Sequence, residues 1–305
     1  KSFSSFLNNW DHSDVMLVPK LFPVLLTARS LIGTRHKATV PCMEVLQHSP
    51  EEIAPGCNLV WLEAVDSTQD EAKRYVPLPP GVDLLGIGSN IQLKGRGTRG
   101  RDWLCEPGNM FLTMATPMAQ IPVTLTLTPL KVGSIVAKAV QTSLIHAQGA
   151  DDARVTLKWP NDVLVNEKKV GGILVEGDGT YLFVGVGVNV ANAPGVPNEG
   201  PQRGRPSTCL AEHGLASSPD LVKALAVDIA RQLGAWVQSP MGSGSEAPEH
   251  VREEWTGLVD WTCELTLRDD ATTKVSPLRL EADGSLLVRN LSDGSKRLLI
   301  AEYLH

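Results

Sequence analysis

The chain has 305 residues, of which 42% are hydrophobic and 20% charged, and its formal net charge is -6 at pH 7. These values are typical of a soluble globular protein, and the net negative charge argues against a general nucleic-acid-binding protein. The five cysteines are widely spaced and form no CxxC pair, so a disulfide framework or zinc site is not expected and a reducing intracellular compartment is. No apolar run reaches the length of a membrane span, and we expect no membrane partner.

Residues 1–57 are expected to form an N-terminal extension of unclear role. Pro19 and Pro23 interrupt its apolar runs and favour extended segments over helices. It contains no convincing helix-turn-helix pattern. A cytoplasmic location is expected, with a mitochondrial targeting segment as the alternative because Arg29, Arg35 and several serines lie near the start.

The central part of the chain, residues 58–256, is expected to be a single catalytic domain. The apolar patterns predict strands at residues 59–65, 82–89, 110–115, 155–158, 163–165, 170–175 and 181–189. They predict helices at about residues 68–75, 130–146, 219–237 and 249–255. The Gly-Ser-rich stretch at 239–246 is a flexible linker or insertion.

The last part of the chain, residues 257–305, has a β pattern. Strands are predicted at residues 263–267, 278–281, 286–289 and 297–300. Asp283-Gly284 and Asp293-Gly294 are strong hairpin turn signals. We therefore expect a small β-barrel at this end.

The run from Gly95 to Trp103, GRGTRGRDW, interleaves three glycines with three arginines. Glycine lets the backbone approach a ligand closely, and arginine is a permanently charged, forked donor for phosphate and carboxylate oxygens. Because the arginines repel one another, we expect the loop to stay mobile and its arginines to gain partners only when an anion binds. The indole of Trp103 could then cover a flat ring such as a purine.

Two other interpretations of this loop exist. Its glycines match the dinucleotide fingerprint GxGxxG, but Pro107 and Gly108 follow too closely for the long helix that this fingerprint requires. The loop could also be an ordinary solvated basic segment.

A second stretch, from Lys158 to Glu176, contains the sequence KWPND. Lys158 ends a predicted strand, and the turn that follows places its ammonium beside several polar groups. The next two strands are expected to form a hairpin turned at residues 166–168. The sequence therefore predicts one positive charge at a polar turn.

Together these motifs resemble the biotin protein ligase family, also called holocarboxylase synthetase. The family signature is a GRGRxGRxW-like loop followed by KWPND and a downstream K-x-x-G-I-L. The matching segments occur here in family order, and they are DSTQD (66–70), GRGTRGRDW (95–103), KWPND (158–162), KVGGIL (169–174) and GVGVN (185–189). Five ordered motifs are far more specific than any one of them.

The resemblance implies an α+β fold. Its catalytic domain would be a mixed β-sheet flanked by helices, class II synthetase-like, and its small C-terminal domain would be SH3-like. It also implies that biotin and ATP, with Mg²⁺, form biotinyl-5′-AMP. The biotin would then pass to a lysine of the biotin carboxyl carrier domain of a biotin-dependent carboxylase, such as acetyl-CoA carboxylase. No nucleic-acid or membrane partner is implied.

The resemblance also implies a set of site residues. Those expected to bind biotin are Ser67, Thr68, Gln69, Gln92, Arg96, Gly97, Thr98, Lys158, Gly172, Ile173 and Leu174. Those expected to bind ATP or the adenylate are Gly95, Arg96, Arg99, Arg101, Trp103, Lys158, Asn161 and Asn189. Lys158 and Arg96 are the expected catalytic residues, because positive charge offsets the repulsion between a carboxylate and an α-phosphate. Gly171 would join the apolar wall of the biotin site, and Asp162 is close enough to be considered as a magnesium ligand.

Simpler roles exist for several of these residues. Ser67 and Thr68 could be plain helix caps, Gln92 a surface glutamine and Asn189 the cap of a strand end. Two other functions are alternatives for the whole chain: a lipoate ligase, which shares the fold, and a non-catalytic biotin sensor or repressor. Thr98 departs from the family pattern, which has arginine there. The neighbouring arginines either compensate for this change, or the adenylate is held loosely.

Overall fold

The computed structural model describes residues 49–145, 147, 152–197, 204–239, 247–267 and 272–301, except for the side chain of Arg99. All of these belong to one compact unit, Gln47–His305. The predicted extended segments near the N-terminus, and the Gly-Ser-rich stretch from residue 240, lie outside the described residues.

An eight-stranded sheet forms the centre of the fold, in the order β1-β2-β3-β4-β8-β7-β6-β5. Its strands are β1 (Glu51–Ala54), β2 (Cys57–Val65), β3 (Leu84–Gln92), β4 (Met110–Pro117), β5 (Val155–Lys158), β6 (Asp162–Val165), β7 (Lys168–Gly177) and β8 (Tyr181–Val188). β2 and β3 pair in parallel, and the other neighbours pair antiparallel. The expectation of a mixed sheet is confirmed. The sheet begins earlier than expected, because β1 and Cys57 fall within the predicted extension of residues 1–57.

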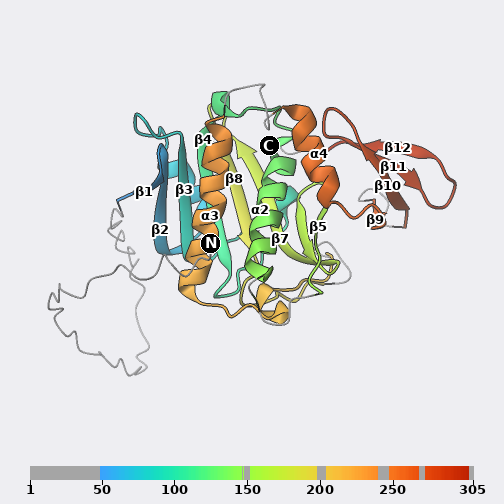
Figure 1. The fold of residues 1–305 in the computed structure, drawn as a ribbon, viewed down its shortest axis with the longest axis horizontal. Helices are drawn as coiled ribbons and strands as arrows, with labels where there is room; N and C mark the ends of the chain where they lie inside the picture. The colour runs from blue at the N-terminus through green and yellow to red at the C-terminus, as the bar shows by residue number, and fades with distance from the viewer. Residues whose placement is uncertain are drawn as a thin grey trace, which may run out of the picture. The chain divides into compact units, whose positions relative to one another are not determined.

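Helices cover the sheet on its two faces, and each lies close to its predicted position. They are α1 (Thr68–Arg74), α2 (Thr128–Ile145), α3 (Pro219–Val237) and α4 (Pro248–Leu258). α2 and α3 lie side by side against one face, where buried side chains of α2, α3 and α4 share the main hydrophobic core with the sheet (Figure 1). Ala72 of α1 belongs to a second, smaller cluster with Val60 and Phe183. Burial on both faces explains why the central strands are nearly all apolar.

The parallel pair β2–β3 decides where the polar loops meet. Parallel strands need a crossover connection, which here contains α1, and their carboxyl ends point to the same edge of the sheet. β2 ends at Val65, just before Ser67, and β3 ends at Gln92, just before the arginine-rich loop. Two segments that lie far apart in the sequence therefore start from the same edge.

The hairpin between β6 and β7 turns at Asn166 and Glu167, as predicted. Both residues have positive φ angles, 47° and 67°. Two such residues in a two-residue loop give the twist that suits antiparallel strands. The turn directs the start of β7 back toward Asp162, which pairs with Lys158 on one side and Gly172 on the other.

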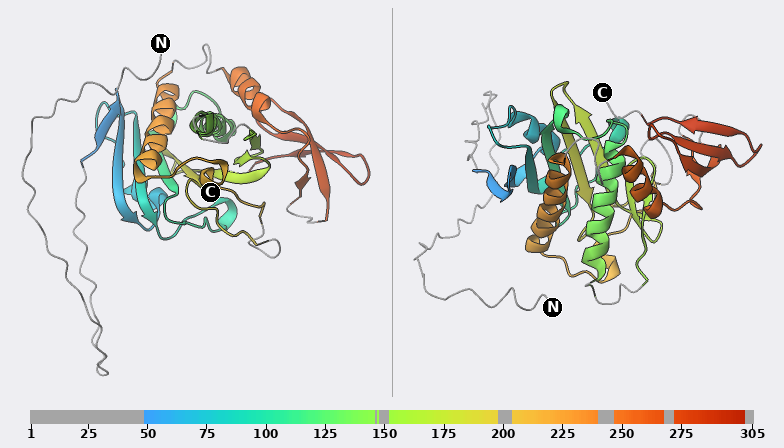
Figure 2. Two further views of the ribbon diagram at one scale, coloured as in Figure 1. Left: turned by 60° about the horizontal axis from the view of Figure 1, so that its bottom comes forward. Right: turned by 45° about the horizontal axis from the view of Figure 1, so that its top comes forward.

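The C-terminal strands form a separate four-stranded antiparallel sheet in the order β12-β11-β10-β9, drawn in red in Figures 1 and 2. Its strands are β9 (Leu265–Thr266), β10 (Lys274–Leu280), β11 (Leu286–Asn290) and β12 (Lys296–Leu299). Gly284 and Gly294 have φ angles of 84° and 74°, which confirms both predicted turns. A barrel is not described; the described residues form an open sheet.

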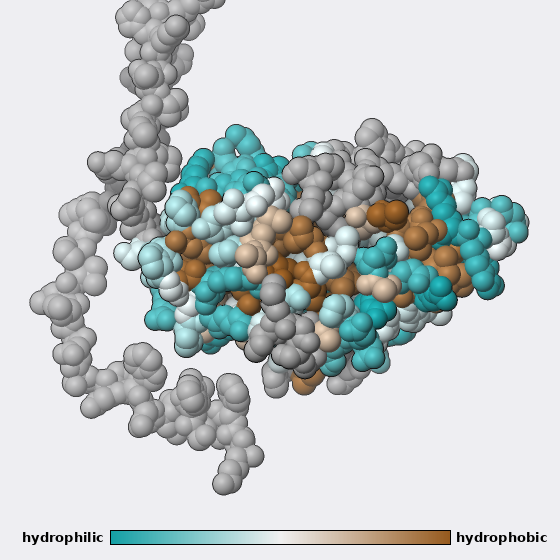
Figure 3. All heavy atoms as spheres, turned by 90° about the horizontal axis from the view of Figure 1, so that it is seen from above, coloured by the Kyte–Doolittle hydropathy of each residue, from teal (hydrophilic) through white to brown (hydrophobic). Residues whose placement is uncertain are grey.

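The indole of Trp159 connects this small sheet to the large one. Its Nε1 donates a hydrogen bond to the carbonyl oxygen of Gly284 at 3.0 Å, and Leu157 forms a parallel β-bridge with Val259. The hydropathy surface in Figure 3 shows hydrophobic residues (brown) exposed between polar ones, and the small sheet exposes Leu291 and Leu298. The division into domains stays a prediction, but the turn between β10 and β11 is hydrogen-bonded to Trp159, the residue that follows Lys158.

Candidate functional site

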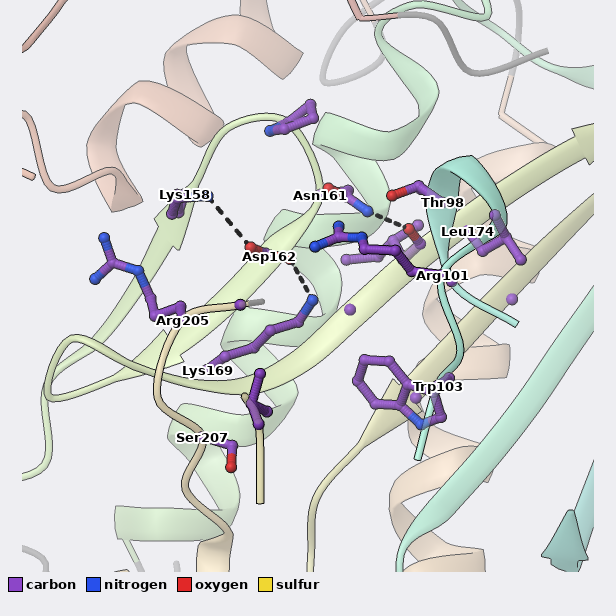
Figure 4. Close-up of a pocket in the computed structure, with 18 of the residues that line it drawn as sticks. Thr98, Arg101, Trp103, Lys158, Asn161, Asp162, Lys169, Leu174, Arg205 and Ser207 are labelled. Carbon is purple, nitrogen blue, oxygen red and sulfur yellow. Dashed lines mark hydrogen bonds and ion pairs between the residues drawn. The ribbon is translucent and has the colours of Figure 1, made fainter. Parts of the chain in front are cut away.

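A single cavity of about 1890 Å³ collects most of the predicted site residues (Figure 4). The predicted residues that line it are Ser67, Thr68, Gln69, Gln92, Arg96, Gly97, Thr98, Arg101, Trp103, Lys158, Asn161, Asp162, Gly172, Ile173, Leu174 and Asn189. They come from the ends of β2 and β3, the arginine-rich loop, and the middle of the sheet. Its remaining wall includes residues 194–197 and 204–207 and part of the C-terminal sheet.

Strand β8 forms the floor of this cavity. Gly185, Gly187 and Asn189 all line it, because alternate residues of a strand face the same side. Because the two glycines have no side chains, other side chains can pack directly on the strand backbone. A Cβ on Gly185 would lie 3.3 Å from Cδ of Gln69, and a Cβ on Gly187 would lie 2.6 Å from Cε2 of Trp103. The cavity floor is therefore covered by these two side chains.

Two buried amides at the ends of this floor lack partners among the described residues. Gln69 is 4% exposed, and neither its Nε2 nor its Oε1 has a hydrogen-bond partner. Asn189 is 2% exposed; its Nδ2 donates to the carbonyl oxygen of Thr208 at 3.0 Å, but its Oδ1 is unsatisfied. Four residues of strand separate Gly185 from Asn189, or about 13 Å. Because unsatisfied buried polar groups are costly, both amides are suited to bind a ligand.

Between these ends, the indole of Trp103 lies across a pair of glycines. Gly172 of β7 is directly opposite Gly187 of β8, and a Cβ on Gly172 would come within 2.9 Å of the ring. The ammonium of Lys169 is 5.3 Å from the centroid of the indole, a cation–π distance. The indole Nε1 has no partner among the described residues.

Lys158, Asp162 and Lys169 form a charged cluster at the same level of the sheet. Asp162 accepts ion pairs from Lys158 at 3.4 Å and from Lys169 at 2.6 Å. Burial alone would raise the pKa of Asp162, but attraction to the two ammonium groups outweighs burial and holds this pKa well below its usual range. Figure 4 shows the two lysines reaching Asp162 from opposite sides. The cluster keeps one net positive charge above the floor.

The arginine-rich loop is closed by short backbone hydrogen bonds. Gly97 N donates to the oxygen of Arg101 at 2.7 Å, and Trp103 N donates to the oxygen of Gly95 at 3.0 Å. Arg96 already has two acidic partners, Asp70 at 2.8 Å and Glu176 at 3.3 Å. The expectation that the arginines gain partners only on binding is therefore wrong for Arg96, because acidic residues of α1 and β7 lie within its reach.

A chain of hydrogen bonds fixes the other side of the cavity. Gln92 Oε1 accepts from the backbone N of Thr68 at 2.8 Å and from its Oγ1 at 3.0 Å. Gln92 Nε2 donates to the Cys105 thiol at 3.2 Å, and burial raises the pKa of this thiol. Gln92 is thus buried and fully engaged rather than a surface residue. Ser67 occupies the N-cap position of α1, yet its hydroxyl makes no capping bond, so the capping role is wrong for this side chain.

Four predicted contributions differ from expectation or lie outside the described part. Gly95 and Gly171 do not line the cavity; Gly95 packs beneath the loop against Cys105, and Gly171 lies close to the carbonyl oxygen of Gly187. Ile173 reaches the cavity with its backbone, since its side chain packs toward Gly133 of α2 in the main core. The side chain of Arg99 is outside the described residues.

The sequence analysis did not indicate the wall at residues 194–197 and 204–207, nor the roles of Lys169 and Thr113 in the lining and of Asn109 behind it. Lys169 belongs to a quoted motif, but its approach to Asp162 depends on the tight hairpin turn. Thr113 donates to Thr68 Oγ1 at 2.9 Å across adjacent elements. Asn109 bonds residues about eighty positions further along the chain, and no local pattern could indicate that contact.

No group of three or more His, Cys, Asp or Glu residues able to hold a metal ion occurs in the described part of the chain. Both carboxylate oxygens of Asp162 already face ammonium groups. The geometry thus provides no support for Asp162 as a metal ligand. Within the same residues, no helix is long and apolar enough to cross a membrane.

Known proteins resemble this chain in sequence and in fold. Residues 61–189 match the model of the Biotin/lipoate A/B protein ligase family. Biotin--[acetyl-CoA-carboxylase] ligase of Paracoccus denitrificans is 35% identical over 164 residues, 52% of this chain and 65% of the relative. Bifunctional ligase/repressor BirA of Escherichia coli is 37% identical over 143 residues, 45% of this chain and 41% of the relative. The matches therefore span less than two thirds of these curated relatives.

Among solved structures, the biotin protein ligase from Leishmania major in complex with biotin has a TM-score of 0.56 and 29% identity, covering 80% of this chain and 98% of that one. The same ligase in complex with biotinyl-5-AMP has a TM-score of 0.54 and 28% identity, with 80% and 98% coverage. The segment that carries the sheet and most of the cavity motifs, residues 61–189, is thus similar to the biotin/lipoate A/B protein ligases. Within that class, the curated relative and the solved structures that the chain resembles are biotin protein ligases.

Proposed function

We propose that the protein is a biotin–protein ligase, which forms biotinyl-5′-AMP and then biotinylates a lysine of a carboxylase carrier domain. The observation that carries this proposal is the order of groups along the cavity floor. An unsatisfied amide, Gln69, lies at one end, the lysine cluster lies in the middle, and the unsatisfied Oδ1 of Asn189 lies at the other end. Biotinyl-5′-AMP has a ureido group, a negatively charged linkage and an adenine in the same order.

The Gln69 end suits the ureido ring of biotin. A ureido group carries one carbonyl acceptor and two N–H donors, and a glutamine amide offers both a donor and an acceptor. Neither atom of the Gln69 amide has a partner in the described protein, so a bound ureido group would satisfy both. The dithiolane ring of lipoate has no N–H to donate, and this favours biotin over lipoate.

The lysine cluster suits the chemistry at the centre. In the first step a carboxylate oxygen of biotin attacks the α-phosphorus of ATP, a P–O bond forms, and pyrophosphate leaves. Both reactants are anions, so Lys158 lowers the barrier by stabilising the charge that develops on the phosphate oxygens. Lys169 adds a second cation nearby, and Arg96 lies at the cavity wall.

The Asn189 end suits adenine, because an unsatisfied carbonyl oxygen can accept a hydrogen bond from the exocyclic amine. Trp103 could stack on the same ligand, although its indole lies at the level of the lysines. Magnesium enters as part of MgATP, and we assign no protein ligand to it.

In the second step, the amine of the carrier lysine attacks the carbonyl carbon of the anhydride. The C–O bond to phosphate breaks, AMP leaves, and an amide is formed. No covalent bond to the enzyme is needed. A biotin carboxyl carrier domain is therefore the proposed macromolecular partner, and a cytoplasmic location is proposed with it.

The test is pyrophosphate release by the full chain with MgATP and either biotin or lipoate. Biotin-dependent release supports the ligase, and lipoate-dependent release would support the alternative acyl ligase. Binding of biotin without pyrophosphate release would favour a sensor. The variant Gln69→Leu should lose biotin affinity by about tenfold or more, since it removes both hydrogen bonds to the ureido group.

A further inference from the structure

The side chain of Asn109, at the start of β4, holds the backbone that follows β8. Its Oδ1 accepts hydrogen bonds from three consecutive backbone N–H groups: Val190 at 2.9 Å, Ala191 at 3.0 Å and Asn192 at 3.1 Å. Its Nδ2 donates to the carbonyl oxygen of Asn192 at 2.8 Å. Asn109 is 1% exposed, so these bonds are shielded from competing water.

The same turn is also tied to residues 104–107, the segment that follows the arginine-rich loop. Asn192 Nδ2 donates to the carbonyl oxygen of Pro107 at 2.7 Å. Gly108 has a φ of 78°, and a Cβ there would lie only 2.8 Å from Cβ of Ala191. Glycine is therefore required at 108 both for its φ angle and for this close approach.

Beyond the turn, the chain forms a second wall of the cavity, residues 194–197. This segment is held to residues 204–207 by the bond from Gly204 N to the oxygen of Pro197 at 3.1 Å and by a bond from Ser207 Oγ to the oxygen of Pro194. Asn189, with its unsatisfied Oδ1, immediately precedes the turn. Asn109 thus holds the turn that leads into the second wall. It also follows closely after the first wall, which is the arginine-rich loop.

The hydrogen bonds of Asn109 and Asn192 connect the chain before the second wall to the chain after the arginine-rich loop. Three hydrogen bonds converge on one oxygen, so any displacement of residues 190–192 away from Asn109 leaves buried N–H groups unpaired, which is costly. Displacing residues 104–107, which follow the arginine-rich loop, breaks the hydrogen bond from Asn192 to Pro107. The described geometry joins the two walls through one small polar cluster.

We propose that Asn109 is a positioning residue that couples the two walls, so that binding at the biotin end pre-orders the adenine end. The inference rests on the proposed function, because it names biotin and ATP as the two ligands. Coupling of this kind is reciprocal: each ligand must raise the affinity of the other by the same factor. Such factors are about 5–150 in coupled proteins.

The experiment measures the dissociation constant of biotin by titration calorimetry, with and without saturating non-hydrolysable ATP analogue. The full chain is compared with Asn109→Ala, Asn192→Ala and the control Asn290→Ala. Asn290 also accepts hydrogen bonds within a turn, from Ser292, but in the C-terminal sheet. In the wild type and the control, the analogue should tighten biotin binding at least about fivefold.

Asn192→Ala removes one exposed side-chain bond, so the fold should be retained. Its affinity for biotin alone should be unchanged, while the coupling factor should fall by at least about threefold, as expected for one lost hydrogen bond. Asn109→Ala should lower the factor toward one and raise KM for ATP more than KM for biotin. A purely structural role would instead weaken both ligands equally and leave the factor unchanged.

The proposal is overturned if folded Asn192→Ala and Asn109→Ala keep the wild-type coupling factor, or if the wild type binds both ligands without coupling. Failure of the wild type to bind biotin or the ATP analogue would instead overturn the proposed function. Circular dichroism and thermal unfolding identify a variant that has not folded. If Asn109→Ala has not folded, the coupling factor of Asn192→Ala decides whether the proposal holds.

Discussion

The ammonium nitrogen of Lys169 lies 2.6 Å from Oδ1 of Asp162, while the same ammonium stands 5.3 Å from the centre of the Trp103 indole. Asp162 also holds Lys158 at 3.4 Å. One carboxylate therefore orients two cations, and one of them touches the aromatic side chain over the cavity floor. Removal of the Asp162 charge would leave both lysines without this partner. Because the Asp162 side chain is only 11% exposed, water would replace the lost ion pairs poorly.

Asp162→Asn should destabilise the protein by about 2–4 kcal/mol at pH 7, because it breaks a largely buried ion-pair cluster. The native pKa of Asp162 is depressed, so its stabilising effect is complete above its unfolded value of about 3.9 and is lost as the pH falls below it. Urea unfolding of both proteins at several pH values tests this. A stability difference that stays constant down to pH 3 would contradict the pairing.

Lys158→Ala should lower biotin-dependent pyrophosphate release by about a hundredfold to a thousandfold, the usual cost of removing one preorganised charge from the transition state. Lys169 keeps Asp162 paired in this variant, so the fold should be preserved. Lys223→Ala is the matched control, since Lys223 also pairs with a carboxylate, that of Glu51 at 3.5 Å, but does not line this cavity. If Lys158→Ala releases pyrophosphate at a near-normal rate, Lys158 has no role in the first step.

Gly187→Ala should disrupt the cavity floor, because its Cβ would lie 2.6 Å from the Trp103 ring. We expect adenylate formation to fall at least about tenfold, as the indole is displaced and the floor is raised. Gly133→Ala is the control, because a Cβ there meets its nearest neighbour, Leu157, at an ordinary 3.5 Å.

The Trp103→Ala and Gly187→Ala/Trp103→Ala variants complete the double-mutant cycle for this floor contact. Removing the indole removes the clash, so the combined effect should be smaller than the product of the single effects. The near-UV circular dichroism of each variant reports the indole environment. Strictly multiplicative effects on activity would show that the two positions act independently.

We expect Thr98 and Arg101 to decide how tightly the adenylate is retained. Figure 4 shows both side chains at the cavity, with Arg101 extended toward Asn161. If Arg101 compensates for the neutral Thr98, Arg101→Ala should speed release of biotinyl-AMP by about tenfold to a hundredfold. Thr98→Arg should restore retention in that background.

The measurements for Thr98 and Arg101 are the release rate of biotinyl-AMP and the labelling of a bystander protein. If Thr98→Arg alone lowers both the release rate of biotinyl-AMP and the bystander labelling relative to the wild type, the loose-retention alternative is supported instead. Equal slow release by all variants would exclude both explanations.

Most of the fold could be predicted because apolar periodicity and turn residues are local signals. The α3 bounds and the turn at Asn166 and Glu167 agree with the structure for this reason. Strand β9 is shorter than predicted, at Leu265–Thr266, because pairing with β10 rather than local composition sets its length. The order of the sheet depends on long-range pairing and could not be read from the sequence alone.

The site was predictable from its motifs, but its internal contacts were not. Motif residues such as Gln92 and Lys158 lie where expected, since strand ends are local features. The pairing of Arg96 with Glu176 and the position of Trp103 over Gly187 involve residues about eighty positions apart. Such contacts depend on how loops pack across the sheet, which neither spacing nor composition specifies.

The hydrogen bond from Trp159 to Gly284 has a consequence for protein synthesis. The indole next to Lys158 finds its acceptor only when the chain has been translated to residue 284, 125 positions later. A premature stop codon before that glycine would leave a buried N–H unpaired beside the active centre, although every signature motif had already been made. Truncated chains that end between Asn189, in the last signature motif, and Gly284 should therefore lose activity.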